Sequence, residues 1–163
     1  MAVVHLNSDL APLLWLSPIL VAVGYYDLRY MRIPNTLSLI GLALWVLSLV
    51  VFPPADLFAR FAVAGIVFAI GFTGFFFRLL GGGDVKILTV LMLFIPVSTL
   101  AVFGNVFSAS LVLGVAFVLT ARRVPALAHV PFKSLSPNAG FPMGISIAMA
   151  GLAHPLAVTL LFG

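Results

Sequence analysis

Charge is scarce in this sequence, and cysteine and glutamate are missing from it altogether. Only 7% of the 163 residues are charged, whereas 63% are hydrophobic and the mean hydropathy is +1.28. A soluble domain carries about 25% charged residues, so the composition excludes an ordinary soluble protein. The absence of cysteine excludes disulfides, thiolate nucleophiles and Cys-ligated zinc. The composition therefore predicts a membrane protein, with the lipid bilayer as its first partner.

The few polar residues limit the chemistry that is available. Any carboxylate chemistry must come from four aspartates, which are Asp9, Asp27, Asp56 and Asp84. The eight Lys and Arg residues are scattered between apolar runs rather than gathered on one polar face, so no nucleic-acid partner is expected. Neither a metal site nor a cofactor is expected, because no ligand spacing relates the three histidines, which are His5, His129 and His154.

Long apolar runs predict the fold class. A helix needs about 20 apolar residues to cross a hydrocarbon core, and five runs approach that length: residues 10–26, 36–52, 57–77, 99–121 and 141–162. Residues 85–100 form a further apolar segment, separated from the next run by a turn at residues 96–99 or, alternatively, at Gly104-Asn105. We therefore predict an all-α membrane protein, a bundle of six transmembrane helices in which residues 1–163 form a single domain.

Basic residues predict the orientation, because Lys and Arg favour the cytoplasmic side of short loops. With six spans and both termini on the periplasmic side, Arg60 is the only basic residue on that side. The basic residues on the cytoplasmic side are then Arg29, Arg32, Arg78, Lys86, Arg122, Arg123 and Lys133. Five spans would divide that set between the two sides. A helix over residues 84–95 is only about 18 Å long and cannot cross alone, which places Asp84 below the membrane surface.

Two segments on the predicted cytoplasmic side each contribute one aspartate, YYDLRYMRIPN at residues 25–35 and GGGDVK at residues 81–86. Acids next to hydrocarbon are costly to keep charged and are functional candidates. Two carboxyl groups that lie close together do not both ionise easily, so one can act as a base toward water while the other polarises a peptide carbonyl. The glycines before Asp84 suit such a site, because they let a substrate backbone approach and allow φ > 0.

Structural roles are also open for these residues. Asp84 alone could be the N-cap of the fourth helix, and Asp27 could pair with Arg29. We interpret Asn35 as an N-cap for the second helix rather than as a catalytic group. Lys86 is interpreted as a topology or pairing residue rather than as a catalytic base.

The motifs of this chain resemble those of a known family. DLRYMRIPN at residues 27–35 fits the pattern D-x-R-x-x-x-I-P-N, and GGGDVK at residues 81–86 fits G-x-G-D-x-K. Together they resemble the type IV prepilin peptidases, membrane aspartic proteases of the GxGD class. FPMG at residues 141–144 is similar to the Pro-x-Gly that opens the last helix of that family. Gly144, with Ala148 one turn later, is also expected to allow close packing of this helix.

The resemblance implies that Asp27 and Asp84 are the catalytic pair. The residues that it implies as supporting or substrate-binding are Gly81, Gly82, Gly83, Lys86, Arg29, Pro34 and Asn35. It also implies a prepilin substrate, cut at the cytoplasmic face of the bacterial inner membrane between a basic leader, ending in glycine, and the hydrophobic segment of the mature pilin. The short loop from residue 27 to 36 and the absence of cysteine resemble the compact members that serve Flp/Tad pili, which implies no N-methylation and no separate methyltransferase domain.

Other functions also fit a pair of membrane acids, and the oligomeric state is left open. In a small proton-coupled transporter the two acids would relay protons. The spans expected at residues 57–77, 99–121 and 141–162, however, contain no acid or base in their central stretches to continue such a route. In a non-enzymatic pilus-assembly scaffold both acids would be structural.

Overall fold

The structure, a computed structural model, describes residues 2–124, 130–136 and 139–162. Helices account for most of these residues. In these ranges there are six α-helices and no strand: α1 (Ala2–Tyr30), α2 (Asn35–Val51), α3 (Leu57–Phe76), α4 (Gly82–Phe94), α5 (Leu100–Arg122) and α6 (Met143–Phe162). Short 3-10 turns, η1 (Val97–Thr99) and η3 (Lys133–Leu135), precede α5 and α6. The prediction of an all-α protein is confirmed.

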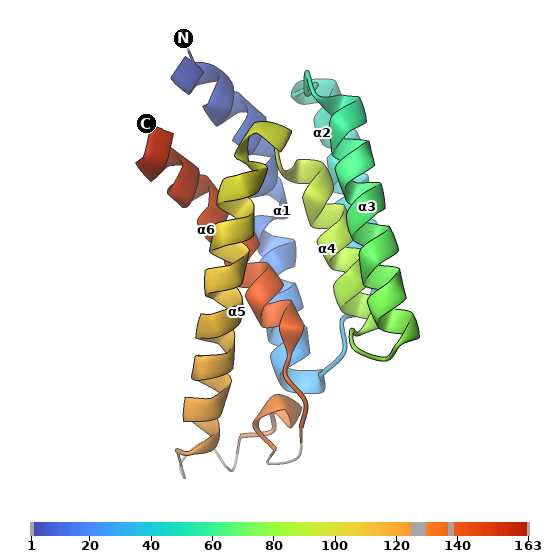
Figure 1. The fold of residues 1–163 in the computed structure, drawn as a ribbon, viewed down its shortest axis with the longest axis vertical. Coiled ribbons are helices and arrows are strands. Elements are labelled where there is room, and N and C mark those ends of the chain that lie inside the picture. Colours follow the sequence, from blue (N-terminus) through green and yellow to red (C-terminus); the bar gives the residue numbers. More distant parts are fainter. Residues whose placement is uncertain (1, 125–129, 137–138, 163) are drawn as a thin grey trace.

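Consecutive helices run in opposite directions (Figure 1). Both chain termini lie at one end of the molecule, together with the α2–α3 and α4–α5 turns, and we call this the terminal end. The α1–α2, α3–α4 and α5–α6 links lie at the opposite end, which we call the loop end. Short connections impose this alternation, because each helix must start where the previous one stopped.

Four helical segments in the described residues are long and apolar enough to cross a membrane: Asp9–Tyr30, Leu57–Phe76, Val97–Arg122 and Met143–Phe162. α2 is also apolar but has only 17 residues, and α4 has 13, which corresponds to about 20 Å. The short fourth helix is thus confirmed. The turn at residues 96–99 is confirmed as well, and Gly104-Asn105 lies inside α5.

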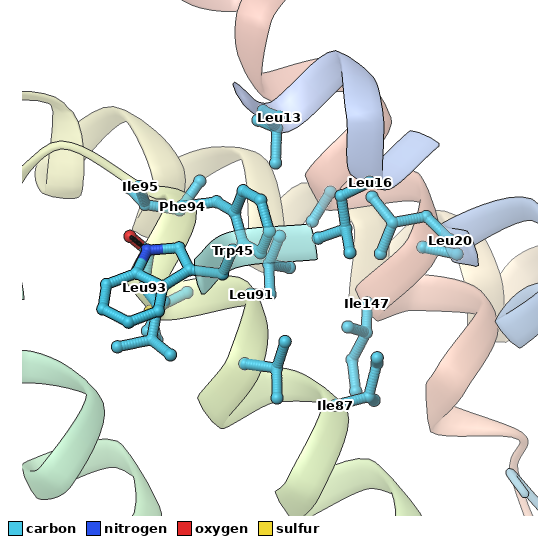
Figure 2. Packing of buried hydrophobic residues seen from close by; sticks show 14 of the residues in the cluster. Leu13, Leu16, Leu20, Trp45, Ile87, Leu91, Leu93, Phe94, Ile95 and Ile147 are labelled. Carbon is cyan, nitrogen blue, oxygen red and sulfur yellow. Dashed lines mark hydrogen bonds between the residues drawn. The ribbon is translucent and has the colours of Figure 1, made fainter. Parts of the chain in front are cut away.

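The short helix α4 lies in the middle of the molecule, where it packs against α1, α2, α3 and α6. Seven of its 13 residues are buried, which is typical of a core helix that is apolar on every side. Figure 2 shows how side chains from α1, α2 and α6 meet those of α4; the labelled ones are Leu13, Leu16, Leu20, Trp45, Ile87, Leu91, Leu93, Phe94, Ile95 and Ile147. Packing along its whole length therefore holds the helix that carries Asp84.

A polar cluster holds the C-terminal end of α4. The Arg60 side chain is buried, and its Nη1 donates hydrogen bonds to the carbonyls of Phe94 (3.2 Å) and Leu93 (3.4 Å). Arg60 Nε also donates to Asp56 Oδ1 at 2.6 Å, and Asp56 Oδ2 accepts the Val97 N–H at 2.8 Å. The last carbonyls of a helix lack intrahelical partners, so a cation there satisfies them and opposes the helix dipole.

α6 contains a buried histidine, which lies beside the α4–α5 turn. His154 is fully buried, and its Nε2 lies 3.0 Å from the hydroxyl of Thr99. Its ring meets Phe103 edge-on, with 5.6 Å between the ring centroids. The sequence did not reveal this contact because the two partners are 55 positions apart. His129 and the side chain of His5 lie outside the described residues.

Candidate active site

A cavity of about 550 Å³ opens at the loop end of the molecule. Its walls come from the end of α1, the link to α2, the start of α2 and the residues that open α4. The lining residues are Asp27, Met31, Arg32, Ile33, Pro34, Asn35, Gly81, Gly82, Gly83, Asp84 and Lys86. The fold therefore brings the two sequence motifs together around one space, although two helices separate them along the chain.

Asp27 lies in the last turns of α1 and is only 5% exposed. Its Oδ2 accepts a hydrogen bond of 2.6 Å from the backbone N–H of Gly144, the second residue of α6. The alternative of an Asp27–Arg29 pair is wrong. Arg29 instead donates to the hydroxyl of Tyr25, and its guanidinium stacks 5.7 Å from the ring centroid of Tyr25 and 5.3 Å from that of Tyr30. Arg29 is not among the residues that line the cavity.

Asp84 lies in the first turn of α4. The helix begins at Gly82 with Gly81 as its N-cap, so the alternative of Asp84 as the N-cap is wrong. Asp84 Oδ1 is buried and has no hydrogen-bond partner in the described part of the chain. A carboxyl oxygen in this state is ready to bind a group that enters the cavity, because buried polar atoms are stabilised by a partner.

Two helix N-termini point at this pair of carboxyl groups. Asp84 lies within the first turn of α4, and Asp27 accepts the N–H of a residue in the first turn of α6. Free N–H groups and the positive end of the helix dipole both favour negative charge at such positions. The backbone thus compensates part of the cost of holding two acids away from bulk water.

The three glycines before Asp84 lie in close contact with their surroundings, and the space is smallest for a rigid neighbour at Gly83. A Cβ atom on Gly83 would lie 2.9 Å from Ile33 Cβ, and one on Gly81 would lie 2.6 Å from Asp84 Oδ2. A Cβ atom on Gly82 would approach the Phe75 ring to 3.2 Å. No glycine in the described ranges has a positive φ, so the backbone freedom that these glycines allow is not used there. Gly83 instead lets the start of α4 lie against Ile33 in the link from α1.

Asn35 and Lys86 meet at the rim of the cavity. Lys86 Nζ donates a hydrogen bond of 2.9 Å to Asn35 Oδ1, and both side chains are exposed. The N-cap prediction for Asn35 is wrong, because Pro34 is the N-cap and Asn35 is the first residue of α2. The interpretation of Lys86 as a pairing residue is confirmed, with an amide oxygen rather than an acid as its partner.

Sequence reasoning missed part of the site. Met31, Arg32 and Ile33 line the cavity, and the signal for them is their position within the first motif, just before Pro34. Gly144 was interpreted as a packing residue, and this role is confirmed, because a Cβ atom on it would lie 2.8 Å from Ile33 Cδ1. Its hydrogen bond to Asp27 was not predicted, since the two residues are 117 positions apart.

The arrangement has the groups for hydrolysis by a carboxyl pair. Two carboxyl groups from different helices face one open cavity, where one can hold a proton while the other acts as a base. No group of three or more His, Asp or Glu side chains that could hold a metal ion is present in the described residues.

Comparison with known proteins gives the family. No curated protein and no solved structure shows significant similarity to the chain. The model of the type IV leader peptidase family, however, matches residues 14–119, which is well over half of the sequence and includes both cavity aspartates. The chain therefore belongs to the type IV leader peptidase family, and it is a membrane protease of the prepilin peptidase type.

Proposed function

We propose that the protein removes the basic leader from type IV prepilins of the Flp/Tad kind, with Asp27 and Asp84 as its catalytic pair. The observation that carries this proposal is that the only two acids in the matched motifs, although they come from separate helices, line the same cavity. Substrate binding falls to the other motif residues of the lining, which are Gly81, Gly82, Gly83, Pro34, Asn35 and Lys86.

The proposed reaction uses water and the two carboxyl groups. The ionised carboxylate of the pair takes a proton from water, and the resulting oxygen adds to the scissile carbonyl carbon. The protonated carboxyl of the pair donates a hydrogen bond to the carbonyl oxygen as negative charge develops there. The C–N bond of the tetrahedral intermediate then breaks, a proton passes to the leaving nitrogen, and one shared proton is left on the pair. The pair thus supplies both the base and the acid.

We place the cavity at the cytoplasmic face of the bacterial inner membrane, with all six helices crossing and both termini in the periplasm. The distribution of charge supports this orientation. Arg29, Arg32, Arg78, Lys86 and Arg122 belong to helix ends and links of the loop end, whereas Arg60 lies in the first turn of α3 at the terminal end. Lys and Arg favour cytoplasmic loops. A basic leader on the cytoplasmic side would meet the cavity there.

We further propose that cleavage occurs without N-methylation and that residues 1–163 form one peptidase domain. The link between α1 and α2 consists of residues 31–34 alone and has no room for an additional cytoplasmic segment. A short loop at this place is one of the features by which the chain resembles the compact members, for which no N-methylation is implied. The short link therefore supports assignment to the compact group.

Coexpression with a Flp-type prepilin tests the proposal. The wild-type protein should convert the prepilin to a shorter form on a gel, and Asp27→Asn and Asp84→Asn should each reduce the rate of conversion by about 10²–10⁴-fold, because each removes the acid or the base. Mass spectrometry of the product should give a mature N-terminus without an added methyl group.

Asp9→Asn is the matched control, since Asp9 lies on the same helix as Asp27 but not in the cavity lining. This variant should process the prepilin at the wild-type rate. All variants should reach the membrane in equal amounts and unfold at similar temperatures in detergent. Continued processing by both Asp27→Asn and Asp84→Asn would rule out the catalytic pair.

A further inference from the structure

Arg122, the last residue of α5, binds three backbone carbonyls of the segment that leads into α6. Its Nη2 donates hydrogen bonds to the carbonyl oxygens of Ser134 (2.8 Å), Ala139 (2.9 Å) and Gly140 (2.8 Å). Its Nε donates a further bond of 3.0 Å to Ser134. The guanidinium thus joins the end of one helix to two separate parts of the connection that follows it.

This geometry suits arginine in particular. A guanidinium carries five N–H donors in a rigid plane, so it can reach several carbonyls without much loss of side-chain entropy. The neighbouring Arg123 has the same charge, but its side chain is exposed. The two arginines therefore give the same charge signal for topology. They differ in the contacts with backbone carbonyls, which Arg122 makes.

The bound segment continues directly to the candidate active site. After Gly140 the chain passes through Phe141 and the buried Pro142 into α6, whose second residue is Gly144. Proline restricts the backbone at this point, since its ring fixes φ. The Gly144 N–H donates the 2.6 Å hydrogen bond to Asp27 Oδ2. The position of that N–H group accordingly depends on where residues 139 and 140 are held.

We propose that Arg122 is a positioning residue of the peptidase, which holds residues 139 and 140 so that the Gly144 N–H reaches Asp27. The inference rests on the proposed catalytic role of Asp27. A shift of about 1 Å in a catalytic constellation can lower the rate by about 100-fold. Loss of the Arg122 contacts should therefore lower kcat, whereas KM should change little, because Arg122 does not line the cavity that receives the substrate.

The experiment compares Arg122→Lys, Arg122→Gln and Arg123→Gln with the wild-type protein in detergent. A fluorogenic peptide that spans the leader junction of a Flp-type prepilin serves as substrate. Both Arg122 variants should lower kcat at least about tenfold with KM changed less than about threefold, and Arg123→Gln should match the wild type. The Lys variant keeps the charge for topology, so its loss of kcat would reflect the lost carbonyl contacts.

Hydrogen exchange of the peptide that covers residues 139–147 gives a readout that does not require activity. Exchange of the Gly144 amide should be at least about tenfold faster in both Arg122 variants and unchanged in Arg123→Gln. Unchanged exchange in the Arg122 variants would overturn the inference, and so would a wild-type kcat in Arg122→Lys. A wild-type protein that cleaves no prepilin would instead defeat the proposed function, and the exchange result would then decide whether Arg122 holds Gly144.

Discussion

Gly144 lies so close to Asp27 that one added methyl group would reach the carboxylate. A Cβ atom at this position would lie 2.8 Å from Asp27 Oδ2 and 2.9 Å from Asp27 Cβ. Contacts this short force the side chains or the helix to move. The close approach that requires a missing side chain at this position also lets the Gly144 N–H group bind the acid.

Gly144→Ala should reduce prepilin processing at least about tenfold, because the displaced carboxylate loses both its position and its hydrogen bond. Overpacking should also lower the free energy of unfolding by about 1–3 kcal/mol. Gly104→Ala is the control, since a Cβ atom on Gly104 in α5 would meet nothing within 4 Å. Cleavage assays and thermal unfolding in detergent measure both effects. Normal processing by Gly144→Ala would show that the contact with Asp27 is dispensable.

At the scale of elements, α4 is too short to cross a membrane alone, and other helices fix both of its ends. Its N-terminal end lies against the α1–α2 link through Gly83, and its C-terminal carbonyls bind Arg60 of α3. Trp45 of α2 adds a hydrogen bond from its indole N–H to the Leu93 carbonyl at 2.9 Å. Arg60 therefore has a structural role, which explains a basic residue at the end of the molecule that the proposed orientation places in the periplasm.

The Asp56–Arg60 pair predicts how stability depends on pH. Burial acts to raise the pKa of Asp56, but the Val97 N–H and the hydrogen bond and charge of Arg60 outweigh it, so the pKa lies below its usual value. A carboxyl group whose pKa is lower in the folded than in the unfolded protein stabilises the fold at pH values above its pKa in the unfolded protein, which is about 4 for Asp. This stabilisation is lost as the pH falls through the pKa of the folded protein. The melting temperature of the wild type in detergent should therefore drop below about pH 4.

Asp56→Asn keeps the shape of the side chain but removes its charge. This variant should be less stable than the wild type by about 1–3 kcal/mol at neutral pH, because the buried Arg60 loses its counterion. The difference between the two proteins should shrink as the pH falls below about 4, since the wild-type carboxyl then becomes neutral as well. Tryptophan fluorescence during heating measures both curves. A constant difference at all pH values would contradict the assignment.

At the scale of the whole molecule, the alternation of helix directions puts both termini at one end and the cavity at the other. The cysteine-free sequence makes the membrane orientation easy to test with single cysteines. Ser98 in the α4–α5 turn and Leu79 in the α3–α4 link are both exposed, and they lie at opposite ends.

Ser98→Cys in intact cells should react with a membrane-impermeant maleimide that reaches the periplasm, because the terminal end is expected there. Leu79→Cys should react only after the inner membrane is disrupted. The unmodified cysteine-free protein is the blank for both. Labelling of both cysteines in intact cells would contradict the crossing of α4 and its neighbours, and the reverse pattern would place the cavity in the periplasm.

Much of this fold could be predicted because the signals are local. Run length predicted the apolar helices, Pro96 predicted the turn before α5, and two short motifs singled out Asp27 and Asp84. The parts that could not be predicted depend on residues far apart in the chain. They include the Gly144 hydrogen bond, the Arg122 contacts, the position of Arg29 away from the cavity and the burial of His154.

The sequence by itself determined that the protein lies in a membrane, that it is helical, and that two aspartates are the only acids in its motifs. These properties follow from composition and from spacing within single helices. Only the tertiary structure decided that both acids share one cavity and that the starts of α4 and α6 point at them. The physical reason is that the environment of a carboxyl group is set by the backbone groups that pack against it. The packing of the helices decides which backbone groups those are.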